Sequence, residues 1–289
     1  MAIFQKKFPQ VFSILTTVPG SDILHAYYAL QEIFGRTIVA TEKATGSPSA
    51  IVTILDLEGL NLTEFLNPLS VNVKLARLIV SVWGEYFSET LVRILLVNPP
   101  GIVSVMWQIT KHIVDARTAN RLVFLSHVDQ LKDYLDPSAI PVEYGGEWED
   151  DSGFSSPPSG CTSHPLPVLP LHALDHHAIW KKHGITKAPP STSYSIKSKK
   201  HVDVAIHAPS DGHFVYSYTT SGDVLFSVVR LDNGKEVAVW PSIRLASMTV
   251  PEQGSLPCQE GDFIFRFVSP SHTWLATKVN LSLQFAADI

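Results

Sequence analysis

The sequence has few cysteines, little net charge and no long hydrophobic run. Two cysteines, Cys161 and Cys258, stand among 289 residues, whereas a secreted domain that depends on disulfides carries more. A net charge of −5 argues against the basic surface of a nucleic-acid-binding protein. No apolar run reaches the ~18 residues that a membrane-spanning helix needs. We therefore expect a cytosolic protein that binds no nucleic acid.

The motifs of enzymatic chemistry are also absent. The sequence contains no G-x-S-x-G turn, glycine-rich phosphate loop, C-x-x-C pair or H-E-x-x-H zinc motif. His172 and His176 have the spacing of a helical metal site, but no carboxylate or cysteine set completes it. The sequence therefore predicts no enzyme, no metal site and no cofactor.

Apolar strands alternate with helices through the first half of the chain. Strands joined by helical crossovers run parallel in one buried sheet. We expect strands at 11–15, 50–55, 91–97 and 121–126, and helices after Asp22, within 62–88 and at 102–115. The first half is therefore predicted to be an α/β domain with a mixed, largely parallel sheet flanked by helices.

The helix expected at 102–115 has an unusually narrow polar stripe. Its stripe consists of Ser104, Gln108, Lys111 and Asp115, while almost all of its other residues are apolar. A surface helix normally keeps a wider polar face. Two interpretations stay open: a helix buried by neighbours on two sides, or one whose second apolar face meets a lipid or a membrane surface.

The expected topology brings three polar residues to one edge of the sheet. Because the strands at 91–97 and 121–126 run parallel, the residues that precede them lie at the same edge. Glu89 precedes the first of these strands, Thr118 precedes the second, and Arg121 opens the second. Arginine suits a phosphate group because it forms bidentate, charge-assisted hydrogen bonds. The alternative is an exposed Arg–Glu pair of little energetic consequence.

The second half of the chain has a different pattern. Residues 151–192 are rich in proline, serine and histidine, which predicts a linker. From residue 193 the apolar period is two, and turn residues separate short strands, which predicts a β-sandwich. The expected strands are 202–206, 214–218, 224–228, 237–240, 263–267 and 279–285. The tripeptide Asp232-Asn233-Gly234 predicts a tight hairpin turn.

Four ordered motifs in the first half, at 53–59, 96–100, 131–137 and 140–146, closely resemble the CRAL-TRIO lipid-binding family. The resemblance implies a deep apolar pocket that holds one lipid beneath a mobile gate helix at 102–115. The implied gate and pocket residues are Ile102, Val103, Val105, Met106, Trp107, Ile109 and Ile113. The N-terminal helical segment that normally precedes the lobe is expected to be missing.

The resemblance also implies roles for the polar residues. Glu89, Thr118 and Arg121 occupy positions that engage the head group of phosphatidylinositol. Thr53 matches a strand residue used for phosphocholine, but Ile51 stands where its partner serine would be. A phosphatidylinositol-type phospholipid is therefore the favoured ligand.

The second half resembles the GOLD domain in segments 250–258, 261–267 and 274–283. A CRAL-TRIO lobe followed by a GOLD domain is the arrangement of the supernatant protein factor and the tocopherol-associated proteins. The resemblance implies a module that contacts proteins or membranes. The predicted organisation is a CRAL-TRIO lipid-binding domain at 8–150, a linker at 151–192 and an all-β GOLD sandwich at 193–289.

The leading hypothesis is a protein that binds one lipid and transfers or presents it between membranes, with the GOLD domain docking partners or membranes. Two alternatives stay open: a trafficking adaptor whose lipid lobe is structural, and a carrier of a tocopherol-like vitamin. The expected location is cytoplasmic and peripheral to membranes, with the Golgi as a candidate.

Overall fold

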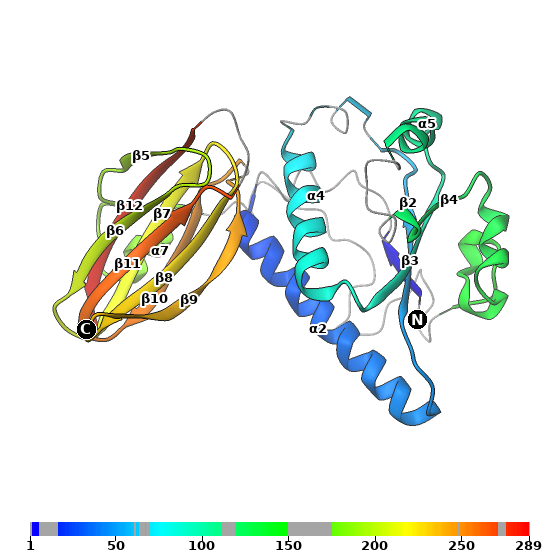
Figure 1. The fold of residues 1–289 in the computed structure, drawn as a ribbon, viewed down its shortest axis with the longest axis horizontal. Helices are drawn as coiled ribbons and strands as arrows, with labels where there is room; N and C mark the ends of the chain where they lie inside the picture. Colours follow the sequence, from blue (N-terminus) through cyan, green and yellow to red (C-terminus); the bar gives the residue numbers. More distant parts are fainter. Residues whose placement is uncertain are drawn as a thin grey trace. The chain divides into compact units, whose positions relative to one another are not determined.

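The computed structural model describes residues 2–5, 17–60, 62–63, 67, 70–110, 119–149, 175–247, 249–270 and 276–288 (Figure 1). The chain separates into two compact units. The first unit comprises residues 1–11, 27–67 and 83–168, and the second comprises residues 12–26, 68–82 and 169–289.

The first unit is built on a four-stranded sheet in the order β1-β2-β3-β4, with every neighbouring pair parallel. Its strands are β1 (Ala2–Gln5), β2 (Ile51–Asp56), β3 (Leu91–Val97) and β4 (Leu122–Phe124). The strands expected at 50–55, 91–97 and 121–126 are confirmed with small shifts in their ends. The strand expected at 11–15 lies outside the described residues, and β1 was not predicted.

Helical segments lie between these strands and after β4. They are α2 (Gly20–Thr45), the π-helix η2 (Trp83–Phe87), α5 (Gly101–Thr110) and three short 3₁₀-helices, η3 (Val128–Asp133), η4 (Pro137–Ala139) and η5 (Val142–Tyr144). The helix after Asp22 is confirmed. The helix expected at 102–115 is confirmed as far as Thr110, and residues 111–115 lie outside the described part.

One face of the sheet is closed by the segment from η3 to η5. Its core side chains are Ile54, Leu95, Val97, Leu125, Leu131, Ile140 and Tyr144. The Tyr144 hydroxyl donates to Asp56 Oδ2 at 2.9 Å, and Asn98 Nδ2 donates to Asp56 Oδ1 at 3.0 Å. These bonds pair a carboxylate that is 4% exposed, which burial would otherwise make costly.

The second unit contains a β-sandwich of two antiparallel sheets, ordered β10-β7-β12-β5 and β6-β11-β8-β9. The strands are β5 (Thr192–Ile196), β6 (His201–Ala208), β7 (Gly212–Thr220), β8 (Val224–Asp232), β9 (Lys235–Leu245), β10 (Glu252–Cys258), β11 (Gly261–Val268) and β12 (Thr277–Ala287). Six of them confirm predicted strands, whereas β5 and β10 were missed.

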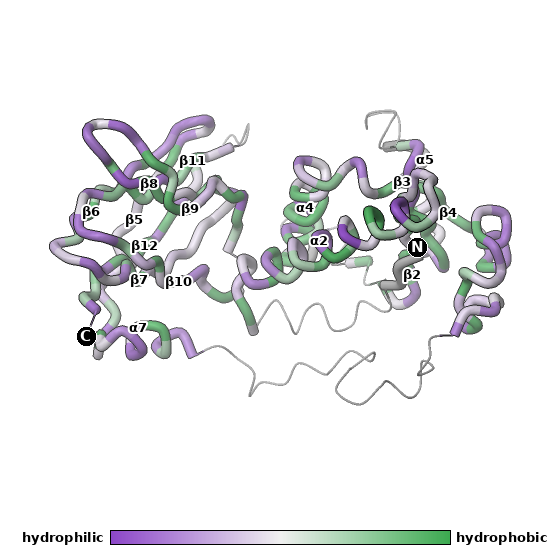
Figure 2. Tube along the Cα trace, turned by 90° about the horizontal axis from the view of Figure 1, so that it is seen from below, coloured by the Kyte–Doolittle hydropathy of each residue, from purple (hydrophilic) through white to green (hydrophobic). Residues whose placement is uncertain are grey.

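Aromatic side chains fill the space between these two sheets. They come mainly from alternate positions of β7, β8 and β11: Phe214, Tyr216, Tyr218, Phe226, Phe263, Phe265 and Phe267. Figure 2 shows the alternation of hydrophobic and hydrophilic residues along the strands. In the β8–β9 turn, Asn233 and Gly234 have φ values of 51° and 76°, so both central residues are left-handed, as the expected hairpin turn requires.

The second unit also includes helical segments. Helix α7 (Ala178–Lys182) buries Trp180 against Val215 and Ala286 of the sandwich. Helix α4 (Val71–Val82) carries Arg77, whose guanidinium forms a bidentate ion pair with Asp223. Nη2 donates to Oδ1 at 2.7 Å and Nε donates to Oδ2 at 3.2 Å. The first turn of α2 is hydrogen-bonded to Glu252 of β10. Of these contacts, the one at Glu252 lies on an edge strand, and the one at Asp223 directly precedes the inner strand β8.

Candidate functional site

The second face of the parallel sheet is apolar but only partly covered. The strand register forms two rows of side chains across β2, β3 and β4, which are Thr53–Ile94–Leu122 and Leu55–Leu96–Phe124. We call these six residues the open face. Of the six, only Leu96 is buried and the other five are half-buried. On the closed face, by contrast, Ile54, Leu95, Val97 and Leu125 are at most 3% exposed.

Helix α5 contacts the open face with one side only. Val103 is buried beside Leu96, and the ring of Trp107 stacks on Phe124 with 5.7 Å between the ring centroids. On its other side, Ile102 and Val105 are 48% and 60% exposed. A helix buried by neighbours on two sides does not fit these exposures. The second interpretation, that the other apolar face meets a lipid or a membrane surface, stays a prediction.

The remaining predicted gate residues lie at or beyond the limits of the description. Met106 and Ile109 belong to α5, but their side chains are outside the described part, and Ile113 lies outside it altogether. The structure thus places Val103 and Trp107 against the sheet and Ile102 and Val105 away from it. Their role as a gate stays a prediction.

Arg121 borders the open face. Its guanidinium carbon lies 5.4 Å from the centre of the Trp83 ring, within cation–π distance. Trp83 packs on a cluster of Phe34, Ile51 and Leu91 to which Ile94 also belongs. Since Ile94 is part of the open face, the cation and the apolar rows share a boundary. This arrangement suits a ligand with one charged end and one apolar end.

The other predicted head-group residues are less closely grouped. The main-chain N–H of Ile94 donates to the carbonyl of Arg121 at 2.7 Å. Because Ile94 pairs with Leu122, Arg121 lies beside Arg93, which is a residue of β3. Glu89 is exposed and precedes β3 by two residues, so the two charges lie at the same end of the sheet but at different levels. Thr53 belongs to the open face beside Ile94. Thr118 lies outside the described residues.

The sequence did not indicate Trp83 as the partner of Arg121, nor the open face as a surface distinct from the closed one. The strands read as apolar on both faces. The signal available in the sequence was the alternation along β2, β3 and β4, which assigns odd and even positions to opposite faces once the register is known.

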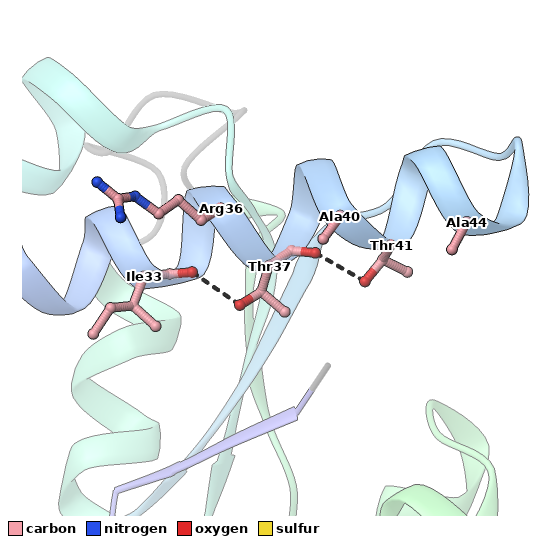
Figure 3. A pocket seen from close by; sticks show the side chains of 6 residues that line it. All are labelled: Ile33, Arg36, Thr37, Ala40, Thr41 and Ala44. Atoms are coloured by element: carbon pink, nitrogen blue, oxygen red, sulfur yellow. Dashed lines mark hydrogen bonds between the residues drawn. The ribbon is translucent and has the colours of Figure 1, made fainter.

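Two hollows are described beside α2. One, of about 560 Å³, is lined by Ile33, Arg36, Thr37, Ala40, Thr41 and Ala44, all on one face of that helix (Figure 3). The hydroxyls of Thr37 and Thr41 donate to the carbonyls of Ile33 and Thr37, each at 2.9 Å, so they serve the helix itself. The other hollow, of about 200 Å³, extends to Ser49 and Ala50. Neither of these two hollows is lined by a predicted head-group or gate residue.

The described ranges also bear on metal binding and on membrane-spanning helices. No group of three or more histidine, cysteine, aspartate or glutamate side chains is placed there to hold a metal ion. His172 falls outside those ranges, so the candidate pair with His176 is not described. The same residues contain no helix with the length and apolarity to cross a membrane.

A parallel sheet with one closed face, one apolar open face and a helix apolar on both sides defines an α/β lobe of the kind that the sequence motifs indicated. Residues 17–146 match the family model of the CRAL/TRIO domain. The chain therefore contains a CRAL/TRIO domain, as the sequence motifs predicted.

Relatives with known names share parts of the chain. A CRAL-TRIO domain-containing protein of Caenorhabditis elegans is 26% identical over 258 residues, which cover 87% of this chain and 63% of the relative. A second protein of that description and organism is 25% identical over 47% of this chain and 33% of its own length. A phosphatidylinositol transfer protein of Kluyveromyces lactis is 34% identical over 26% of this chain and 24% of its own. The chain thus spans less than two thirds of the length of each of these relatives.

Among solved structures, a mitogen from Yersinia pseudotuberculosis covers 35% of this chain and 91% of its own, with 12% identity and a TM-score of 0.26. A TM-score this low supports no conclusion about fold or function.

Proposed function

We propose that this protein binds one hydrophobic lipid between the open face and α5 and transfers or presents it between membranes. The observation that carries the proposal is the contrast between the two faces of one sheet: Ile54, Leu95, Val97 and Leu125 on the closed face are at most 3% exposed, whereas five of the six open-face residues are half-buried. An acyl chain that covered the open face would gain about 0.8 kcal/mol per buried methylene. Apolar burial thus supplies affinity, and the polar edge is left to supply selectivity.

A phosphatidylinositol-type phospholipid is the favoured ligand. Arg121 offers planar N–H groups that match a phosphate, at the border of the open face. Glu89 and Thr118 are proposed to complete the head-group site, and Thr53 is proposed to contact the ligand from the sheet. The match to a phosphatidylinositol transfer protein over part of the chain supports this choice.

The sandwich is proposed to be a GOLD domain that docks protein partners or membranes, with domain limits at 8–150, 151–192 and 193–289. The protein is proposed to be cytoplasmic and peripheral to membranes. Helix α5 contributes to this proposal, because the exposed side chains of Ile102 and Val105 would have an apolar neighbour at a membrane surface.

The test combines ligand identification with a transfer assay. Native mass spectrometry of the purified protein, followed by lipid extraction, would show which lipid is bound. Transfer of fluorescent phosphatidylinositol between vesicles would then be compared for the wild-type protein, Arg121→Glu and Lys132→Glu. Lys132 is an exposed cation in η3, on the closed side, so its charge reversal is a matched control. We expect Arg121→Glu to lose at least ten-fold (~1.4 kcal/mol) in transfer, with Lys132→Glu unchanged.

The outcomes separate the alternatives. Co-purified tocopherol, with transfer insensitive to Arg121→Glu, would support a vitamin carrier. A protein that carries no lipid and transfers none would refute the proposal and favour the adaptor, in which the lobe is structural.

A further inference from the structure

Arg121 is fixed at both ends. Its carbonyl accepts a 2.7 Å hydrogen bond from the N–H of Ile94, which ties its backbone to β3. Its guanidinium carbon lies 5.4 Å from the centre of the Trp83 ring, which constrains the far end of the side chain. A free arginine side chain explores many rotamers, and ordering them costs free energy when a ligand binds. Much of the conformational entropy of the Arg121 side chain is therefore already lost before a ligand binds.

Trp83 is itself held in place. It is the first residue of the π-helix η2, which follows α4 directly, and short π-helical turns occur often at functional sites. The Thr90 hydroxyl donates to the carbonyl of Phe87 at 2.7 Å and closes the chain after this turn. The Trp83 ring packs against Phe34, Ile51 and Leu91, so it is anchored in the core of the lobe.

The contact with Trp83 leaves the guanidinium able to bind an anion. A cation–π contact uses the face of the guanidinium plane, whereas a phosphate accepts hydrogen bonds from the N–H groups at its edge. The two interactions therefore do not compete. An aromatic platform that holds the plane still also fixes the direction in which the N–H groups point.

The neighbouring strand supplies an internal comparison. Arg93, level with Arg121 in the register, has its guanidinium carbon 5.3 Å from the centre of the Tyr134 ring. Arg93 pairs with Val52, which packs in the closed-face core, and Tyr134 directly follows η3. Within the described residues there are thus two arginine–aromatic contacts of nearly the same length, and the Trp83 contact is the one that borders the open face.

We propose that Trp83 is a positioning residue for the head-group site: it holds the Arg121 guanidinium at the border of the open face, and so makes the protein select phosphate-bearing lipids over uncharged ones. The proposal rests on the proposed lipid-binding function and adds the residue that sets its selectivity. Trp83 acts through Arg121 and contributes no hydrogen bond of its own to the ligand.

The test measures selectivity rather than binding alone. The full chain and the variants Trp83→Leu, Trp83→Phe and Tyr134→Leu would be titrated with fluorescent phosphatidylinositol and, separately, with uncharged α-tocopherol. Loss of a cation–π contact corresponds to a two- to five-fold loss of affinity. We expect Trp83→Leu to lower phosphatidylinositol affinity by about that factor more than tocopherol affinity, Trp83→Phe to lie between it and the wild type, and Tyr134→Leu to leave the ratio unchanged.

Each other outcome overturns the proposal. An equal loss for both lipids would make Trp83 a packing residue of the core, and an unchanged ratio would show that Arg121 needs no platform. If Tyr134→Leu changed the ratio of phosphatidylinositol to tocopherol affinity as much as Trp83→Leu does, the effect would come from general destabilisation. If Trp83→Leu does not fold, the ratio measured for Trp83→Phe decides. A wild-type protein that binds neither lipid refutes the proposed function itself, whereas wild-type binding with an unchanged ratio refutes only the role of Trp83.

Discussion

The first turn of α2 is capped by one buried carboxylate of the same unit. Glu252 is 1% exposed, and its two oxygens accept hydrogen bonds from the main-chain N–H groups of Gly20 and Ser21, each at 3.0 Å. The first N–H groups of a helix have no partner within the helix, and a negative charge at this end is favourable. Glu252 therefore acts as a cap supplied from a distant strand.

Replacing this carboxylate with a methyl group removes both bonds. A buried donor left without its partner costs about 1–3 kcal/mol, so we expect Glu252→Ala, which leaves the N–H groups of Gly20 and Ser21 without Glu252, to lower the free energy of unfolding of the second unit by roughly 3 kcal/mol. Glu252→Gln keeps one accepting oxygen but turns an NH₂ group towards the other N–H, so its loss is expected to be about half as large. Glu260→Ala, at an exposed glutamate of the same unit, is the control.

The same carboxylate predicts a pH dependence. Burial raises the pKa of Glu252 above its usual value, the nearby Asp22 raises it further, and the bonds from Ser21 and Gly20 lower it. Tyr216 and Tyr218 of β7 also face it. Burial outweighs the favourable helix-end position, so the folded protein holds this proton more tightly than the unfolded chain. The stability that comes from protonated Glu252 is therefore fully present below about pH 4.5 and is lost as pH rises through the folded pKa. Glu252→Gln should flatten this part of the curve.

The assay is urea unfolding of the full chain from pH 4 to 8, with hydrogen exchange at the amides of Gly20 and Ser21 to report on the cap itself. Faster exchange at these amides in Glu252→Ala, with Glu260→Ala unchanged, would support the reasoning. A Glu252→Ala protein within about 0.5 kcal/mol of the wild type, with both amides still protected, would show that the cap contributes little and refute it.

Two further substitutions test the core of each unit. Tyr144→Phe removes the hydroxyl that donates to the buried Asp56, so thermal unfolding should show a loss of about 1.5–3 kcal/mol; a loss below 0.5 kcal/mol would mean that the bond is dispensable. In Gly254→Ala the new methyl group would overlap both the hydroxyl and the ring carbon Cζ of Tyr216, so we expect a loss of about 1–3 kcal/mol that Tyr216→Phe, which keeps the ring, recovers only in part; full recovery would show that the hydroxyl alone causes the strain.

The sandwich was largely predictable because its strands alternate with period two. The two strands that were missed, β5 and β10, show where prediction from this alternation fails. Strand β5, Thr192–Ile196, has the polar sequence TSYSI and is mostly exposed, so it carries little hydrophobic signal. Strand β10 contains Gly254 and Pro257, which argue against a strand, yet β10 lies at a sheet edge where proline is tolerated. Its glycine is needed because the Tyr216 side chain lies where a Cβ would be.

The charged residues of the candidate site were predictable, but the aromatic contact that holds Arg121 and the register of the strands were not. Parallel topology alone brings Arg121 and Glu89 to one end of the sheet. Trp83 could not be inferred, because a π-helical turn departs from the 3.6-residue period by which helix faces are assigned, and the contact with Arg121 joins residues 38 positions apart. The level difference between Arg121 and Glu89 likewise depends on the register of β3 and β4.

Residues of equal apolarity differ in burial between the two faces of β3. Ile94 and Leu95 are neighbours on β3 and equally hydrophobic, yet Leu95 is fully buried and Ile94 is not. A helix that served only to close the open face would present polar residues outward, since exposed valine and isoleucine gain nothing from water. Helix α5 instead exposes Ile102 and Val105 while Val103 and Trp107 contact the sheet. An apolar molecule on the open face, and a membrane surface on the outer side of α5, would account for both departures together.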